Sequence, residues 1–179
     1  MNLRPILTRL LGDRRGTAAV EFAFVAPLMI LMYCGLAETT QGMMASRRAA
    51  HVATTIGDLT AQQSQINAAT VADIFVVGKA IMVPFPTATL NMRITSVKAD
   101  SGGTPKVVWS QGYGSLAPLS GTVTGVPAGL IGPNESTIQA EVSYTYTSSI
   151  QKTLPGPIVL SQKSFLKPRK GAEVLWSTS

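Results

Sequence analysis

Apolar and polar residues alternate differently in three parts of the chain. The first part is an almost uninterrupted apolar run over residues 17–36, with a single acid, Glu21, near its start. As a helix this run would be about 30 Å long, which matches the hydrocarbon thickness of a bilayer. The pattern therefore predicts a membrane-spanning helix, which we place at residues 17–37.

In the second part the apolar residues recur at helical spacing, in steps of three and four. The first such stripe comprises Ala45, Ala49, Val52, Ile56 and Leu59. Gly57 and Asp58 are candidates for a bend or an end of this helix. A second stripe runs from Ile66 to Ile81 and stops at the proline-rich residues 83–86. We therefore expect a helical stalk over residues 38–82.

In the third part the period changes to two. The clearest alternation is "TIQAEVSYTYT", residues 137–147, and Leu90, Met92 and Ile94 start another. Weaker strand candidates lie around Trp109 and from Ile158 onwards, separated by turns rich in glycine and proline. This pattern predicts a β-rich domain over residues 83–179 with an antiparallel sheet that is polar on one face. The fold class is α+β.

The charge is concentrated at the N-terminus. The formal net charge is +6, and half of it lies in residues 1–16, where four arginines, including Arg14 and Arg15, face one aspartate. Basic residues beside a membrane span stay in the cytoplasm. We therefore expect a cytoplasmic N-terminus and an extracytoplasmic C-terminal domain. Topology explains the arginines, so the sequence pI of about 9.8 does not indicate a nucleic-acid partner.

The sequence offers little for catalysis or metal binding. The single cysteine, Cys34, lies in the apolar run, and the single histidine, His51, excludes a cluster of histidine ligands. No nucleophile elbow or phosphate-binding loop is present. We expect no enzyme activity, no metal and no cofactor. His51 and the Arg47–Arg48 pair fit a solvated or headgroup-facing rim better than a ligand site.

The basic run "KSFLKPRK", residues 163–170, has two interpretations. It could bind an acidic partner or an anionic surface, or it could be a solvated strand edge protected by lysines. The strand edge is favoured.

Several processing routes fit the N-terminal region. A signal peptidase could cut after Ala37, between small residues, and release an exported binding module. The chain could also stay anchored and uncut. A third route is a cut after Gly16 on the cytoplasmic side, which would leave the apolar helix attached. A lipoprotein cut before Cys34 is disfavoured because Tyr33 is bulky.

The segment "RRGTAAVEFAFVAPLMILMY", residues 14–33, resembles the N-terminus of class III prepilins and, more closely, of TadE/TadG-like pseudopilins of tight-adherence (Flp-type) pilus systems. In that family a prepilin-type peptidase cuts after a glycine, and the fifth mature residue is a glutamate followed by an aromatic residue. The resemblance implies cleavage between Gly16 and Thr17, with Glu21 and Phe22 as the motif pair and residues 1–16 as the leader. The Glu-Phe pair and the long tail fit a minor pilin or pseudopilin better than the short major pilins. Residues 47–62 also resemble the helix that follows the membrane segment in TadE-like proteins.

Two roles remain open for Glu21. It could sit at the rim of a shorter span that begins at Phe22. Alternatively, the resemblance implies that the new ammonium of Thr17 pairs with Glu21 of a neighbouring subunit. An acid inside a span costs about 2.5–3.5 kcal/mol on insertion scales, and pairing reduces this cost. Pro27 is expected to kink the helix, unless it is a tolerated proline without a role.

The apolar span predicts a single-pass membrane protein, and the resemblance implies a component of the bacterial inner membrane that acts in the assembly or initiation of a tight-adherence pilus. Its expected partners are a prepilin-type peptidase, other pilin-like subunits, the inner-membrane platform of the pilus and membrane lipid. Incorporation into the pilus itself stays open. The alternative is the exported binding module released after Ala37.

Overall fold

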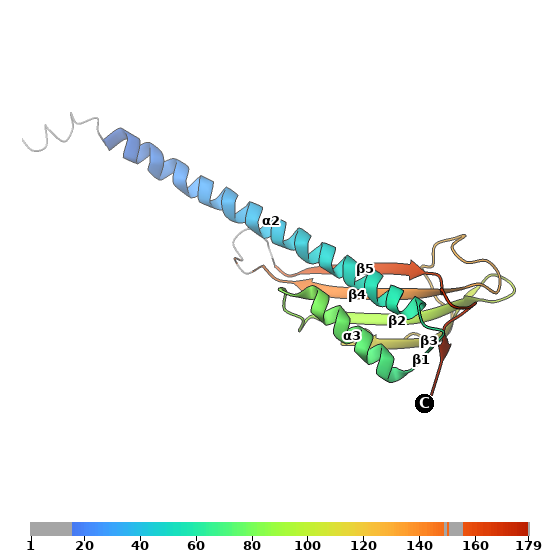
Figure 1. Cartoon of the computed structure of the whole chain (residues 1–179). Coiled ribbons are helices and arrows are strands. Elements are labelled where there is room, and N and C mark those ends of the chain that lie inside the picture. Colours follow the sequence, from blue (N-terminus) through green and yellow to red (C-terminus); the bar gives the residue numbers. More distant parts are fainter. Residues whose placement is uncertain (1–15, 149, 151–155, 179) are drawn as a thin grey trace, which may run out of the picture.

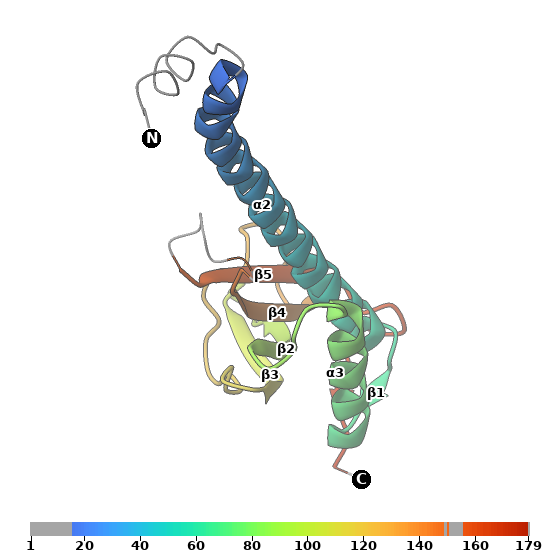
Figure 2. The same cartoon turned by 90° about the vertical axis from the view of Figure 1, so that its left-hand side faces the viewer.

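The computed structural model describes residues 16–148, 150 and 156–178. A long helix extends from a two-layer domain of helices and sheet (Figures 1 and 2). The class is α+β, as predicted. The elements in chain order are helix α2 (Thr17–Ala61), strand β1 (Gln65–Ile66), helix α3 (Ala68–Met82), and strands β2 (Leu90–Ala99), β3 (Pro105–Tyr113), β4 (Ser136–Tyr146), β5 (Ile158–Leu166) and β6 (Leu175–Trp176).

The main sheet has four antiparallel strands in the order β3-β2-β4-β5. All four were predicted from the two-residue period. The clearest predicted strand, β4, is central and pairs with both β2 and β5. The register between β2 and β3 shifts at Ser96 and Val97, where the strands are irregular.

A second sheet was not predicted. The two-residue strands β1 and β6 pair in parallel, with Ile66 opposite Trp176. The indole of Trp109 in β3 donates a hydrogen bond to the carbonyl of Val174 (2.7 Å), and its ring lies 5.3 Å from that of Trp176. These contacts hold the C-terminal segment against the connection between the two helices.

The two helices differ from prediction at their ends. Helix α2 is a single 45-residue helix that continues past Gly57 and Asp58 to Ala61, so an end at Gly57 is wrong. Helix α3 begins at Ala68, because the side chain of Asn67 caps it by accepting a hydrogen bond from the backbone N–H of Thr70 (2.9 Å). Ile66, which we expected in this helix, lies in β1.

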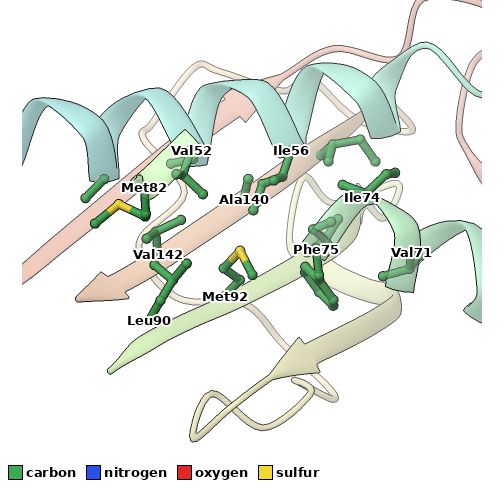
Figure 3. Close-up of a cluster of buried hydrophobic side chains, with 14 of the residues drawn as sticks. Val52, Ile56, Val71, Ile74, Phe75, Met82, Leu90, Met92, Ala140 and Val142 are labelled. Carbon is green, nitrogen blue, oxygen red and sulfur yellow. The ribbon is translucent and has the colours of Figure 1, made fainter. Parts of the chain in front are cut away.

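One face of the main sheet forms the hydrophobic core. The C-terminal half of α2 and the whole of α3 cover this face, and Figure 3 shows their side chains packed against β2 and β4. Val52, Ile56 and Met82 from the helices are fully buried, as are Met92 and Ala140 from the sheet. The predicted stalk therefore contributes both helices of the core. The domain boundaries drawn from the sequence stay predictions.

The opposite face of the sheet is polar, as its alternation predicted, yet its centre is buried. Thr95, Gln139 and Glu141 are all buried there. The connection between β3 and β4 contacts this face: the side chain of Arg93 donates a hydrogen bond to the carbonyl of Ala117 (2.9 Å). A Cβ at Gly112 would lie 1.9 Å from the carbonyl oxygen of Leu116, so only glycine permits this close approach.

Gly57 marks a close approach of α2 to the sheet. A Cβ added there would lie 2.5 Å from Leu166 Cδ1 and 3.2 Å from the Cβ of Ala140. We expect Gly57→Val to lower the free energy of unfolding by about 1–3 kcal/mol through overpacking. Thr54→Val, on an exposed position of the same helix, should change it by less than about 0.5 kcal/mol. Urea unfolding in detergent micelles measures both, and equal midpoints would contradict a close crossing at Gly57.

Candidate functional site

The N-terminal half of α2 projects away from the domain (Figures 1 and 2). We call residues 17–37 the rod. None of its residues, all of which the structure describes, is buried. Large apolar side chains are exposed around its whole circumference, namely Val20, Phe22, Phe24, Val25, Leu28, Met29, Ile30, Leu31, Met32, Tyr33 and Leu36. A helix that is apolar all round is buried in a large core or in a membrane. The helix is long and apolar enough to cross a membrane.

The predicted processing site lies where this helix begins. Gly16 occupies the N-cap position, and Thr17 is the first residue of α2. Gly16 is exposed, and a Cβ built on it would have no heavy atom within 4 Å. The fold therefore leaves space for a side chain at this position. Arg14 and Arg15, on which the predicted orientation depends, lie outside the described residues.

Glu21 lies one helical turn after Thr17. Four residues correspond to about 6 Å along the axis and place both on one side of the helix. Glu21 is the only charged residue of the rod, and it is exposed beside Phe22, whose side chain is 71% exposed. Cleavage after Gly16 would place the new ammonium of Thr17 on the same side of the helix as Glu21. The cleavage and the pairing between copies stay predictions.

Pro27 lies inside α2, which the structure assigns as a helix without interruption from Thr17 to Ala61. A proline here removes one backbone hydrogen bond of the helix. The predicted kink stays a prediction.

The rod enters the domain through a set of contacts that we call the collar, formed by Gly42, Phe85 and Tyr146. Glu38 is fully buried although it follows the apolar run directly. A Cβ at Gly42 would lie 3.6 Å from the ring of Tyr146, and this ring meets Phe85 edge-on at 6.1 Å. Sequence analysis did not identify the collar. The sequence feature that could have indicated it is Gly42, a residue without a side chain just beyond the span, where another part of the chain can approach the helix.

The basic residues of α2 have separate environments. Arg47 and His51 are exposed, in agreement with a solvated rim. Arg48 instead donates a hydrogen bond from Nη1 to the carbonyl of Ile81 (2.8 Å) and so links α2 to the last turn of α3.

The basic run of residues 163–170 lies on and after β5, which is an edge strand. Three of its four cations pair with acids of the same chain. Lys163 contacts Glu141 (2.8 Å), Lys167 contacts Glu135 (3.0 Å), and Arg169 contacts Asp58. This agrees with the favoured interpretation of a strand edge protected by lysines, because carboxylates of the same chain already pair with these cations.

A groove of about 340 Å³ lies between α3 and β3. Phe75 and Tyr113 line it with their rings 5.8 Å apart, and Lys79 Nζ lies 5.4 Å from the centre of the Tyr113 ring. Within the described ranges, no three histidine, cysteine or acidic side chains come together as a metal site. The groove is mainly apolar and offers one cation.

Comparison with known proteins identifies the segment that contains the rod. Residues 16–57 match the family model described as TadE-like protein. Comparison of the chain with curated proteins and with solved structures gives no match. The match begins at Gly16, includes the whole rod and ends at Gly57, where α2 crosses the sheet. The chain therefore contains a TadE-like protein domain at residues 16–57.

Proposed function

We propose that this chain is a TadE-like minor pilin or pseudopilin that the rod anchors in the bacterial inner membrane. It acts in the assembly or initiation of a tight-adherence (Flp-type) pilus. One observation carries the proposal: the family match starts at Gly16, the residue directly before α2, and covers the entire exposed apolar rod with Glu21.

The proposed orientation follows from charge. Arg14 and Arg15 precede the rod, so the N-terminus is cytoplasmic and the sheet domain extracytoplasmic. The rod is apolar around its circumference, which suits lipid and the rods of other pilin-like subunits equally. The further partners are the inner-membrane platform and a prepilin-type peptidase, for which this chain is a substrate and not itself an enzyme.

Two observations favour this proposal over a binding module released after Ala37. The peptide between Ala37 and Glu38 lies in the interior of α2, and Glu38 is fully buried. A cut there would also divide the family match, which continues to Gly57.

Processing provides the direct test. We expect the wild-type chain to be cut after Gly16, which removes 16 of its 179 residues and leaves 163. Gly16→Leu should abolish this cleavage, because a peptidase pocket that accepts glycine excludes a large side chain. Ala18→Leu places the same side chain two residues further along and should be processed. Intact-mass analysis of membrane-extracted protein distinguishes the products, and a wild-type chain that starts at Glu38 or Met1 would refute the proposal.

A further inference from the structure

The two edges of the main sheet are protected differently. The edge strand β5 carries Lys163, and Lys167 follows directly after it. Charged side chains of this kind discourage another strand from pairing with an edge. The opposite edge strand, β3, has neither a charged residue nor a proline from Trp109 to Tyr113. This part of β3 therefore lacks the protection that β5 has.

The backbone of β3 is covered along its first half. The N–H of Val107 donates a hydrogen bond to the carbonyl of Gly121 (2.9 Å), and the N–H of Val123 donates one to the carbonyl of Pro105 (3.0 Å). Over residues 109–113, β2 is the only described segment with which the backbone forms hydrogen bonds. Alternate residues of a paired strand direct their N–H and C=O groups away from the partner. Within the described part of the chain, the second half of β3 thus presents unpaired backbone groups, and most of it is partly exposed.

The groove of about 340 Å³ between α3 and β3 runs along this open edge, and we call it the edge groove. Helix α3 lies at the β3 side of the sheet, whereas α2 lies towards β5 (Figures 1 and 2). From Val71 to Lys79 the helix rises about 12 Å, and the strand from Trp109 to Tyr113 covers about 13 Å. The groove and the open edge thus match in length, and both suit an extended chain of about four residues. The walls of the groove include Val71, Ala72, Phe75 and Lys79 from α3, and Gln111 and Tyr113 from β3.

The edge groove contains a cation that no described carboxylate neutralises. Lys79 Nζ lies 5.4 Å from the centre of the Tyr113 ring and forms no ion pair with any acid of the described residues. The lysines on the strands of the main sheet do pair with acids, namely Lys98, Lys106 and Lys163. The walls of the groove contain no acid either. A ligand that places a carboxylate beside Lys79 is therefore complementary to the groove in charge.

We propose that the edge groove binds an extended, acidic peptide segment of a partner protein, which adds to β3 as a further strand. The backbone of the segment pairs with the open edge, because another extended chain satisfies the unpaired N–H and C=O groups there. Every second side chain of the segment points towards α3, where Val71, Ala72 and Phe75 favour apolar residues. Its carboxylate lies beside Lys79, at the Tyr113 end of the groove. The rod takes no part in the groove, so this binding is independent of the proposed anchor and processing.

Binding of synthetic peptides to the full-length protein in nanodiscs tests the proposal. The probes are fluorescein-labelled peptides of alternating threonine and valine with one glutamate at the first or at the last position, since the segment can run in either direction along β3. In two control peptides glutamine or lysine replaces the glutamate, and a third control is methylated at its backbone nitrogens. Fluorescence anisotropy measures the dissociation constants.

Two alanines of α3 provide matched protein variants. Ala72 and Ala80 are both exposed, and of the two only Ala72 lines the edge groove. Ala72→Arg obstructs the groove and should weaken binding of the glutamate peptide by at least about tenfold, whereas Ala80→Arg should bind it as the wild type does. Lys79→Glu should prefer the lysine peptide to the glutamate peptide by about tenfold, because the charge of the groove is reversed.

The wild type should bind a glutamate peptide more tightly than the glutamine peptide and should not bind the methylated peptide, which lacks the N–H groups that pair with β3. No binding of either glutamate peptide, or equal binding of the methylated peptide, would overturn the proposal. So would equal affinities of Ala72→Arg and Ala80→Arg, or an unchanged preference in Lys79→Glu. A dimer of the unliganded wild type that Ala72→Arg dissociates would assign the groove to a second copy of the chain and would also overturn it.

Discussion

Glu21→Gln is expected to leave membrane insertion and cleavage after Gly16 intact and to abolish most association between subunits. The substitution keeps the size of the side chain and removes its charge, so insertion should be at least as favourable as for the wild type. Cleavage creates an ammonium on Thr17, and the carboxylate of a neighbouring copy is its proposed partner. In the glutamine variant this ammonium stays unpaired in a medium of low dielectric constant.

The expected loss of association is large because the substitution leaves the ammonium of Thr17 buried without its counter-charge. Removing one partner of a buried ion pair costs about 3–5 kcal/mol, which corresponds to more than a hundredfold loss in an association constant. Glu21→Asp keeps the charge and shortens its reach, so it should give an intermediate loss. Crosslinking of processed subunits in membranes and counts of surface filaments measure the effect.

A result without any loss of association would be informative, because substitutions at Glu21 do not affect the fold of the domain. Its side chain is exposed in the single chain, so neither substitution disturbs the core. Wild-type crosslinking and filament numbers in Glu21→Gln would show that no charge pair is required. Glu21 would then be a residue at the rim of the span.

The second large effect is expected at Glu141, on the covered polar face of the sheet. Its side chain is 8% exposed and lies between two cations. Arg93 donates a hydrogen bond from Nε to Glu141 (2.6 Å), and Lys163 Nζ lies 2.8 Å from the other carboxylate oxygen. Arg93 also donates a hydrogen bond to the carbonyl of Ala117, in the connection between β3 and β4 that covers this face. Glu141→Gln should therefore lower the free energy of unfolding by about 3–5 kcal/mol, since it leaves a largely buried guanidinium without its counter-charge.

The same carboxylate should make stability depend on pH. Burial alone would raise the pKa of Glu141, but hydrogen bonds from Lys163 and Arg93 and the charges of both outweigh burial and hold the pKa below its usual value. A folded-state pKa that is lowered gives a stabilisation that is complete above the unfolded-state pKa, about 4.3 for glutamate, and is lost as the pH falls through the folded-state pKa. The difference in unfolding free energy between wild type and Glu141→Gln should thus shrink below about pH 4.3.

Denaturant unfolding in detergent micelles at pH 7 and at several acidic values measures both effects. Glu135→Gln is the matched control, because Glu135 pairs with Lys167 at an exposed site where ion pairs contribute little. Equal unfolding midpoints for the two variants at pH 7 would contradict a stabilising ion cluster under the loop.

Local patterns in the sequence were sufficient to predict the two helices, the four strands of the main sheet and the family of the N-terminal motif. The strands β2 and β4 are recognisable because alternate residues face opposite sides of a sheet, and α3 because its apolar residues share one side of a helix. The rod is recognisable from an apolar run of membrane length. The motif from Gly16 to Phe22 is contiguous, so its resemblance to TadE-like proteins could be detected without a structure, and the family match confirms it.

Contacts between distant residues decided the remaining features. Gly57 interrupts a helix by local propensity, yet α2 continues because a close crossing over Ala140 and Leu166 requires a residue without a side chain. The strands β1 and β6 are too short for any periodicity and exist only because the C-terminal segment meets the connection between α2 and α3. The burial of Glu141 depends on Arg93, Lys163 and a loop without regular structure.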